Sequence, residues 1–216
     1  MTASAQILLQ SHPNVLRLTI HTTRCARLIR TALSTLPVFI RSCLESIFPY
    51  WTLPDTVILK QQKDGWEEDF NVERAAYEKL MQLQGHAIPI LLGQVTYNGV
   101  RALILSDVGG ASMATAGGAL IDGGDILSET ELQTMLYEAL GTMVECGISH
   151  DDIKLDNFRR VERAGKRAIK VLDLERVDAV EPQEDGELMT RSAVEMLVHQ
   201  YREQVKYLRN NGFLPA

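Results

Sequence analysis

The feature that most constrains this 216-residue chain is the polar run at residues 150–157, His-Asp-Asp-Ile-Lys-Leu-Asp-Asn. It fits the pattern H-x-D-x-K-x-x-N, and Asp173 follows soon after, behind the apolar pair Val171 and Leu172. Carboxylates, a lysine and an amide in this order can orient a hydroxyl, neutralise a phosphoryl group and hold magnesium. For such chemistry, the polar run and Asp173 would have to lie close together in the fold.

The residues around this run predict a helix before it and a strand pair after it. Ser128 and Glu131 form a capping box, and apolar residues at helical spacing follow as far as Gly147. The polar run begins directly after that helix. Beyond it, a turn at residues 163–166 separates two short strands.

The rest of the chain predicts an α+β order, with strands and one helix first and mainly helices later. Expected strands lie at 14–20, 56–60, 88–95 and 102–105, and expected helices lie at 24–48 (interrupted near Pro37), 67–83 and 188–208. Tyr97, Asn98 and Gly99 predict a turn between the last two strands. Residues 109–124 contain six glycines and predict a flexible connection.

Composition excludes several classes of protein. A net charge of −6 argues against a general nucleic-acid binder, which needs concentrated positive charge. No apolar stretch reaches the roughly 18–20 residues of a membrane span. The three cysteines, Cys25, Cys43 and Cys146, are scattered without metal-ligand spacing. The simplest interpretation is a reduced, intracellular and cytoplasmic location.

Residues 1–50 are expected to form a basic N-terminal extension or part of the folded domain that follows. The first 44 positions lack acidic residues and are rich in serine and threonine, as in an organelle transit peptide. Ile29, Leu33, Leu36 and Ile40 have helical spacing, which favours a packed helix over a transit peptide.

The polar run, together with Asp173 in Val-Leu-Asp-Leu-Glu, resembles the catalytic and metal-binding loops of protein kinases. The resemblance covers about residues 57–178, and the surroundings of Glu73 are similar to those in kinase-like proteins found in fungi. It implies a two-lobed protein kinase-like domain over 51–216. A small β-rich N-lobe would extend to about 106, a hinge would occupy 106–110, and a shortened helical C-lobe would occupy 111–216.

The resemblance also implies roles for the polar residues of the second half. Asp152 would be the base that accepts the hydroxyl proton, and Lys154 would neutralise the phosphoryl group during transfer. Asn157 and Asp173 would hold Mg²⁺. His150 would support the loop.

In the first half, Lys60 matches the strand lysine that contacts the ATP phosphates in protein kinases. Glu73 is the candidate partner for that lysine, and Glu78 is the alternative. The resemblance further implies a hinge that binds the adenine of ATP through Ser106, Asp107 and Val108.

The implied activity is ATP- and Mg²⁺-dependent transfer of the γ-phosphate to a protein Ser/Thr hydroxyl. Lys154 favours a protein acceptor, because small-molecule kinases of the aminoglycoside and choline type usually lack a lysine at this position. The implied partners are ATP and a protein substrate, without nucleic acid or a membrane span.

Four departures from the kinase pattern keep two alternatives open. No glycine precedes Gly65, so a glycine-rich phosphate loop is missing before Lys60. Asp151 replaces the usual arginine, and Glu175 replaces the usual glycine of the metal loop. Only 43 residues follow Asp173, without an A-P-E motif. The alternatives are a pseudokinase that binds nucleotide or serves as a scaffold, and a small-molecule kinase.

Overall fold

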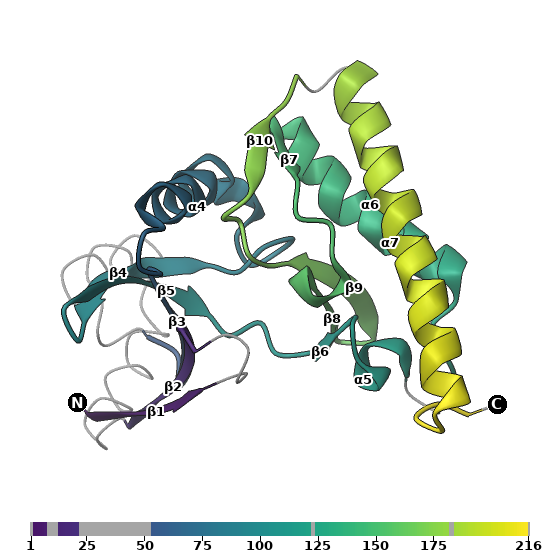
Figure 1. Ribbon diagram of the computed structural model, residues 1–216, viewed down its shortest axis with the longest axis horizontal. Helices are drawn as coiled ribbons and strands as arrows, with labels where there is room; N and C mark the ends of the chain where they lie inside the picture. Colours follow the sequence, from purple (N-terminus) through teal and green to yellow (C-terminus); the bar gives the residue numbers. More distant parts are fainter. Residues whose placement is uncertain (1, 8–12, 22–52, 122–123, 182–183, 216) are drawn as a thin grey trace. The chain divides into compact units, whose positions relative to one another are not determined.

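The computed structural model describes residues 2–7, 13–21, 53–121, 124–181 and 184–215 (Figure 1). It is an α+β structure with antiparallel sheets. The chain forms two compact units: a first unit of Met1–Asp64 and Leu91–Asp107, and a second unit of Gly65–Ile90 and Val108–Ala216. The predicted α+β class is therefore confirmed.

The first unit is a five-stranded antiparallel sheet in the order β1-β2-β3-β5-β4. Its strands are β1 (Thr2–Ile7), β2 (Val15–His21), β3 (Thr56–Gln61), β4 (Leu91–Tyr97) and β5 (Val100–Ser106). Three of the four expected strands are confirmed within a few residues. The fourth, expected from residue 88, begins at Leu91, and β1 was not predicted.

Alternating apolar residues explain the core of this sheet. Leu16, Leu59 and Ala102 form a buried cluster across β2, β3 and β5. Leu59 lies opposite Leu16 on one side and Ile104 on the other, so side chains of one face stack across three strands. The predicted turn joins β4 to β5, with positive φ at Asn98 (52°) and Gly99 (80°).

The second unit contains four α-helices, two short 3₁₀ turns and two small sheets among its described residues. The helical elements are α4 (Glu67–Lys79), η1 (Met81–Leu83), α5 (Ala116–Ala119), α6 (Glu129–Glu145), η2 (Leu155–Asn157) and α7 (Glu184–Asn210). The strands are β6 (Ala111–Ser112), β7 (Ile148–His150), β8 (Phe158–Arg163), β9 (Lys166–Val171) and β10 (Val177–Ala179). The two sheets have the orders β6-β8-β9 and β10-β7.

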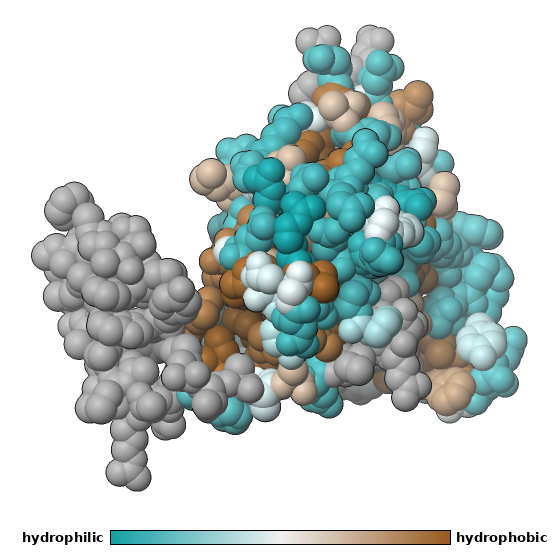
Figure 2. All heavy atoms as spheres, turned by 60° about the vertical axis from the view of Figure 1, so that its left-hand side comes forward, coloured by the Kyte–Doolittle hydropathy of each residue, from teal (hydrophilic) through white to brown (hydrophobic). Residues whose placement is uncertain are grey.

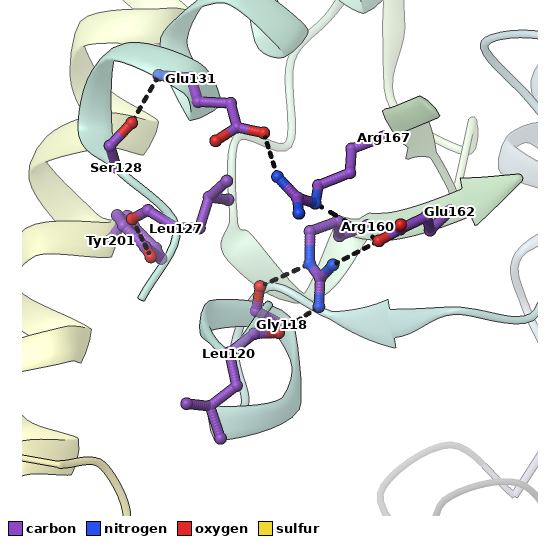
Figure 3. Close-up of polar contacts among 9 residues, drawn as sticks. All are labelled: Gly118, Leu120, Leu127, Ser128, Glu131, Arg160, Glu162, Arg167 and Tyr201. Atoms are coloured by element: carbon purple, nitrogen blue, oxygen red, sulfur yellow. Dashed lines mark hydrogen bonds and ion pairs between the residues drawn. The ribbon is translucent and has the colours of Figure 1, made fainter. Parts of the chain in front are cut away.

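The helix α6 forms as its sequence predicts. Its N-cap Ser128 accepts a hydrogen bond at Oγ from the Glu131 backbone N–H at 3.2 Å (Figure 3). Its buried stripe comprises Leu132, Met135, Leu136, Ala139, Leu140, Met143 and Val144. This stripe packs toward α7 and β9. On α7, Tyr201 is buried and its hydroxyl donates to the Leu127 carbonyl at 2.8 Å.

The glycine-rich segment after β5 is ordered where it is described, so the prediction of a flexible connection over 109–124 is wrong there. It contains β6 and α5, and the Arg160 guanidinium donates to the Gly117 carbonyl and to the carbonyls of Gly118 and Leu120, the last two drawn in Figure 3. A Cβ at Gly118 would lie 2.2 Å from the Ser112 carbonyl oxygen. The glycine here allows two stretches of backbone to approach closely, which the composition alone does not distinguish from flexibility.

The predicted helix at 24–48, and with it the choice between a packed helix and a transit peptide, lies outside the described residues. No helix in the described part of the chain is both long enough and apolar enough to cross a bilayer. Hydrophilic residues cover most of the described surface on the face drawn in Figure 2, with hydrophobic atoms visible between them.

Candidate functional site

The polar run forms a tight loop between β7 and β8 in the second unit. Successive short-range backbone bonds fold it: Lys154 N–H donates to the Asp152 carbonyl and Asn157 N–H donates to the Lys154 carbonyl, both at 3.0 Å. The loop is also fixed from outside, because Asp151 N–H donates to the Arg176 carbonyl at 3.1 Å. These bonds bring the side chains of Asp152, Lys154 and Asn157 together.

The Asp152 carboxylate is the centre of this group. Its Oδ2 accepts from Lys154 Nζ at 2.9 Å and from Asn157 Nδ2 at 3.1 Å. Partial burial alone would raise the pKa of Asp152, but the hydrogen bonds from Lys154 and Asn157 and the positive charge of Lys154 outweigh it and lower this pKa. Asp152 is therefore ionised at neutral pH and can accept a proton.

The Lys154 side chain is 61% exposed, whereas that of Asp152 is 19% exposed. The hydrogen bond to Asp152 raises the pKa of Lys154, with further support from the charges of Asp152 and Asp156. An ion pair with so much solvent around the lysine contributes little to stability. The ammonium group can therefore turn toward another anion at small cost.

A second group of contacts ties this loop to Asp173. Buried His150 donates from Nε2 toward the carbonyls of Leu172 and Asp173, each at 3.1 Å. Leu172 N–H donates to the Asn157 carbonyl at 2.8 Å. Burial lowers the pKa of His150, although the two carbonyl contacts and the Asp173 charge oppose it. The neutral ring joins the two segments without adding charge.

Asp173 belongs to a cluster of three carboxylates with Glu73 and Glu175. One carboxylate oxygen from each residue lies within 4.8 Å of the others. Glu73 comes from α4 and is 1% exposed. One helical turn later, buried Tyr77 has a pKa raised first by burial and then by the charges of Glu73 and Asp173. Hard oxygen ligands of this kind suit Mg²⁺.

The two predicted metal ligands, Asn157 and Asp173, make different contacts in the structure. Asp173 lies in the carboxylate cluster, whereas the side chain of Asn157 donates its amide N–H groups to Asp152 Oδ2 and to the Asp152 carbonyl. Sequence reasoning did not identify Glu175 as a candidate ligand. Its position two residues after Asp173 is the available signal, although the kinase pattern expects a glycine there.

The predicted nucleotide residues of the first unit lie on adjacent strands. Lys60, on β3, is 8% exposed and pairs with Val15 on β2 and Leu103 on β5. Ser106 ends β5 opposite Val57. Because Glu73 belongs to the second unit, its pairing with Lys60 stays a prediction. The alternative partner, Glu78, forms an exposed ion pair with Arg74 at 2.5 Å.

Asp107 and Val108 lie where the chain leaves the first unit. The Asp107 carboxylate forms an ion pair with Arg17 Nη2 at 2.6 Å, and the Asp107 side chain is 13% exposed. Sequence reasoning missed Arg17, since no local pattern relates β2 to a residue ninety positions later. The contact fixes the side chain of Asp107, while hinge binding of adenine would use backbone groups.

No protein-family model matches this chain, and no curated protein sequence matches it.

Proposed function

We propose that this chain is a protein kinase-like phosphotransferase that uses ATP and Mg²⁺ to phosphorylate serine or threonine hydroxyls on proteins. The observation that carries the proposal is the group of Asp152, Lys154 and Asn157. Contacts of His150 and Leu172 link this group to Asp173. Its residue types and their connections meet the requirements of phosphoryl transfer.

In the proposed reaction, ionised Asp152 orients the acceptor hydroxyl and takes its proton. The hydroxyl oxygen forms a bond to the γ-phosphorus of ATP, the bond between that phosphorus and the β–γ bridging oxygen breaks, and ADP leaves. Lys154, exposed and one hydrogen bond from Asp152, neutralises the charge of the transferring group.

The residues present fit a magnesium ion. Asp173 and Asn157 would hold it, and Glu175 supplies a further carboxylate in the cluster with Asp173. When bound, Mg²⁺ neutralises the phosphate oxygens. Glu73 would instead direct Lys60 toward the phosphates, and Ser106, Asp107 and Val108 would form the hinge. The N-lobe of a two-lobed kinase fold would extend to about residue 106, with the five-stranded sheet of the first unit as its β-rich part, and residues 111–216 would form the C-lobe.

One observation favours a pseudokinase as the second candidate. The segment before Lys60 contains no glycine, so backbone amides cannot approach phosphates there as a glycine-rich loop allows. A nucleotide-binding or scaffold protein with the same fold would tolerate this loss better than an enzyme would.

A thermal-shift titration with ATP, with and without Mg²⁺, tests the proposal. A ligand that binds only the folded state stabilises it by about 2.7 kcal/mol at a hundredfold excess over its Kd. We expect a magnesium-dependent rise in Tm, and we expect Asp173→Ala to abolish it while far-UV circular dichroism stays unchanged. The matched control is Asp151→Ala, an exposed carboxylate in the same region, which should respond like the wild type. Absence of any shift at millimolar ATP would overturn the proposal.

A further inference from the structure

A cavity of about 550 Å³ opens beside the proposed base, within the second unit. Asp152 and Lys154 line it on one side, Leu140 and Val144 of α6 form part of its wall, and residues 188–196 of α7 complete it. Its volume falls within the range of ligand-binding cavities, roughly 300–1,000 Å³. An occupant of this cavity would therefore contact the residue that accepts the hydroxyl proton.

The α7 wall is an apolar helix face that remains exposed. Leu188, Met189 and Met196 are 60%, 41% and 51% exposed, and with Ser192 and Ala193 they have the i, i+1, i+4, i+5, i+8 spacing of one face. Other apolar residues of α7, such as Leu197 and Tyr201, are buried in the core. Packing of the unit thus explains the buried residues of α7 but leaves this face available for binding.

The apolar face of α7 is held against the loop of residues 150–157. Gln200 Nε2 donates to the Ile153 carbonyl at 3.0 Å, which joins α7 directly to the residue after Asp152. At the other end, a Cβ added to Gly186 would lie 2.5 Å from Val144 Cγ1, so α7 and α6 approach closely there. The distance between the apolar face and Asp152 is therefore fixed by packing.

We infer that this groove binds the acceptor, and that the acceptor is a polypeptide segment with a bulky aliphatic side chain next to its serine or threonine. The inference rests on the proposed function. Aliphatic walls select an apolar side chain, and the two methionines adapt to different shapes of it. The cavity also reaches Asp152, so a segment seated on α7 presents the neighbouring hydroxyl to the base. The transfer step is the one given above, with the proton moving to Asp152 and ADP leaving.

Peptide libraries test the inference directly. Each peptide carries one serine and a fixed neighbouring residue, either leucine, methionine, aspartate or glycine, and transfer from labelled ATP with Mg²⁺ is measured on the full chain. We expect kcat/KM to be about 10- to 100-fold higher for the aliphatic peptides, the range that a hydrophobic pocket can discriminate.

Variants of α7 provide the matched comparison. Met196→Glu should lower kcat/KM for the aliphatic peptides about tenfold or more and leave the ATP-dependent Tm shift unchanged, while Met196→Leu, which keeps the wall apolar, should lower kcat/KM much less than Met196→Glu does. Tyr207→Glu, at a 59% exposed position of α7 outside the cavity, is the control and should behave like the wild type.

The outcomes separate this inference from the proposed function. Transfer without an aliphatic preference, or Met196→Glu with unchanged kcat/KM, would overturn the acceptor groove and leave the kinase proposal intact. A magnesium-dependent ATP shift without transfer to any peptide would also overturn a polypeptide acceptor. A chain that shows no ATP shift would contradict the proposed function itself.

Discussion

Asp152 shows how a single carboxylate can be kept charged in a partly buried loop. Two donors of different kinds, the Lys154 ammonium and the Asn157 amide, bind the same oxygen. Because their effect exceeds that of burial, the pKa of Asp152 is lowered and the side chain stays ionised at the pH of an ordinary assay. Asn157 therefore has a measurable role in the loop, whether or not it also holds a metal.

Replacing Asp152 should separate nucleotide binding from transfer. Asp152→Asn keeps the size of the side chain but cannot take the proton, so we expect transfer to fall by about 100-fold or more. ATP affinity, measured by the magnesium-dependent Tm shift, should stay within about twofold of wild type, since the base acts on the acceptor. Asp151→Asn serves as the control at an exposed neighbour. Undiminished transfer by Asp152→Asn would mean that another group is the base.

Single residues were predictable where their role is local. Ser128 and Glu131 form the cap that their spacing predicts, because both partners lie within one helical turn. The ion pair of Arg17 with Asp107 and the proximity of the Glu175 and Glu73 carboxylates were not predictable. They depend on how distant segments pack, which no short pattern encodes.

At the scale of elements, one arginine holds together the ordered glycine-rich segment. The Arg160 guanidinium, on β8, donates to the carbonyls of Gly117, Gly118 and Leu120 in and just after α5. It also forms an ion pair with Glu162 at 3.8 Å, and Figure 3 shows this pair with the bonds to Gly118 and Leu120. The guanidinium offers five donors in a fixed planar fork, whereas an ammonium group is a compact point charge with three donors on a flexible stem. The helix α5 is only four residues long, and a helix this short is not stable by itself. The hydrogen bonds from Arg160 therefore stabilise it.

Arg160→Lys should therefore destabilise the chain while keeping the charge. We expect the free energy of unfolding in urea to fall by about 2–3 kcal/mol, because the partly buried carbonyls of Gly118 and Leu120 lose charged hydrogen bonds. Arg167→Lys, which alters ion pairs with Glu131 and Glu162 near the surface, should change it much less. Equal effects of the two substitutions would show that the α5 carbonyls gain nothing from Arg160.

The anchor between α7 and the residue before the α6 cap should respond to alkaline pH. Burial raises the pKa of Tyr201 to about 12 from 10.0, and its hydroxyl donates to the Leu127 carbonyl. Between these two pKa values the folded state binds more protons than the unfolded state. Stability from this group is therefore complete below pH 10 and is lost as pH rises toward 12.

Tyr201→Phe isolates this contribution. Near pH 8 we expect the variant to be about 1 kcal/mol less stable, because the Leu127 carbonyl loses its donor. Between pH 10 and about 12, the wild type should lose up to about 2–3 kcal/mol more than the variant in urea unfolding. Parallel pH profiles of the two proteins would contradict the assigned shift.

Helices and strands with one apolar face were predicted well. Segments whose structure depends on contacts with distant parts of the chain were predicted poorly. The strands β2, β3 and β5 and the helix α6 follow their apolar periods. The strand β1 carries little such pattern and forms as an edge strand paired to β2. The segment 109–124 was predicted incorrectly because glycine permits both flexibility and the close contacts that Gly118 makes.

For the whole molecule, the order of segments along the chain differs from their order in space. The second unit takes its first segment, residues 65–90, from between two strands of the first unit. This segment contributes buried Tyr77, Leu80 and Ile88. It also accepts bonds from the later segment, at the Ala87 carbonyl from Val171 N–H (2.8 Å) and at the Gly85 carbonyl from Lys170 Nζ (2.7 Å).

A fragment of residues 108–216 should therefore fail to fold alone, although it holds most of the proposed active site. We expect it to lack a cooperative urea transition, because the apolar residues and carbonyls of 65–90 are missing from its core. Adding a 65–90 peptide in trans should restore a cooperative transition in a concentration-dependent manner, whereas a scrambled peptide should not. A cooperative transition of the fragment alone would contradict this dependence.

The interleaved segments also determine the order in which the protein can be completed on the ribosome. The strand β3 is finished at Gln61, but its partner β5 ends 45 residues later, at Ser106. At about 5–20 residues per second, that interval lasts roughly 2–9 s. The delay is longer still before Val171, the hydrogen-bond partner of Ala87 in residues 65–90, has been synthesised. During synthesis the nascent chain thus presents an unpaired strand edge and an uncovered apolar helix together. Chaperones that bind nascent chains can cover these exposed surfaces during synthesis. Removing such chaperones should therefore lower the yield of folded protein from cells, while the free energy of unfolding of the purified protein should not change.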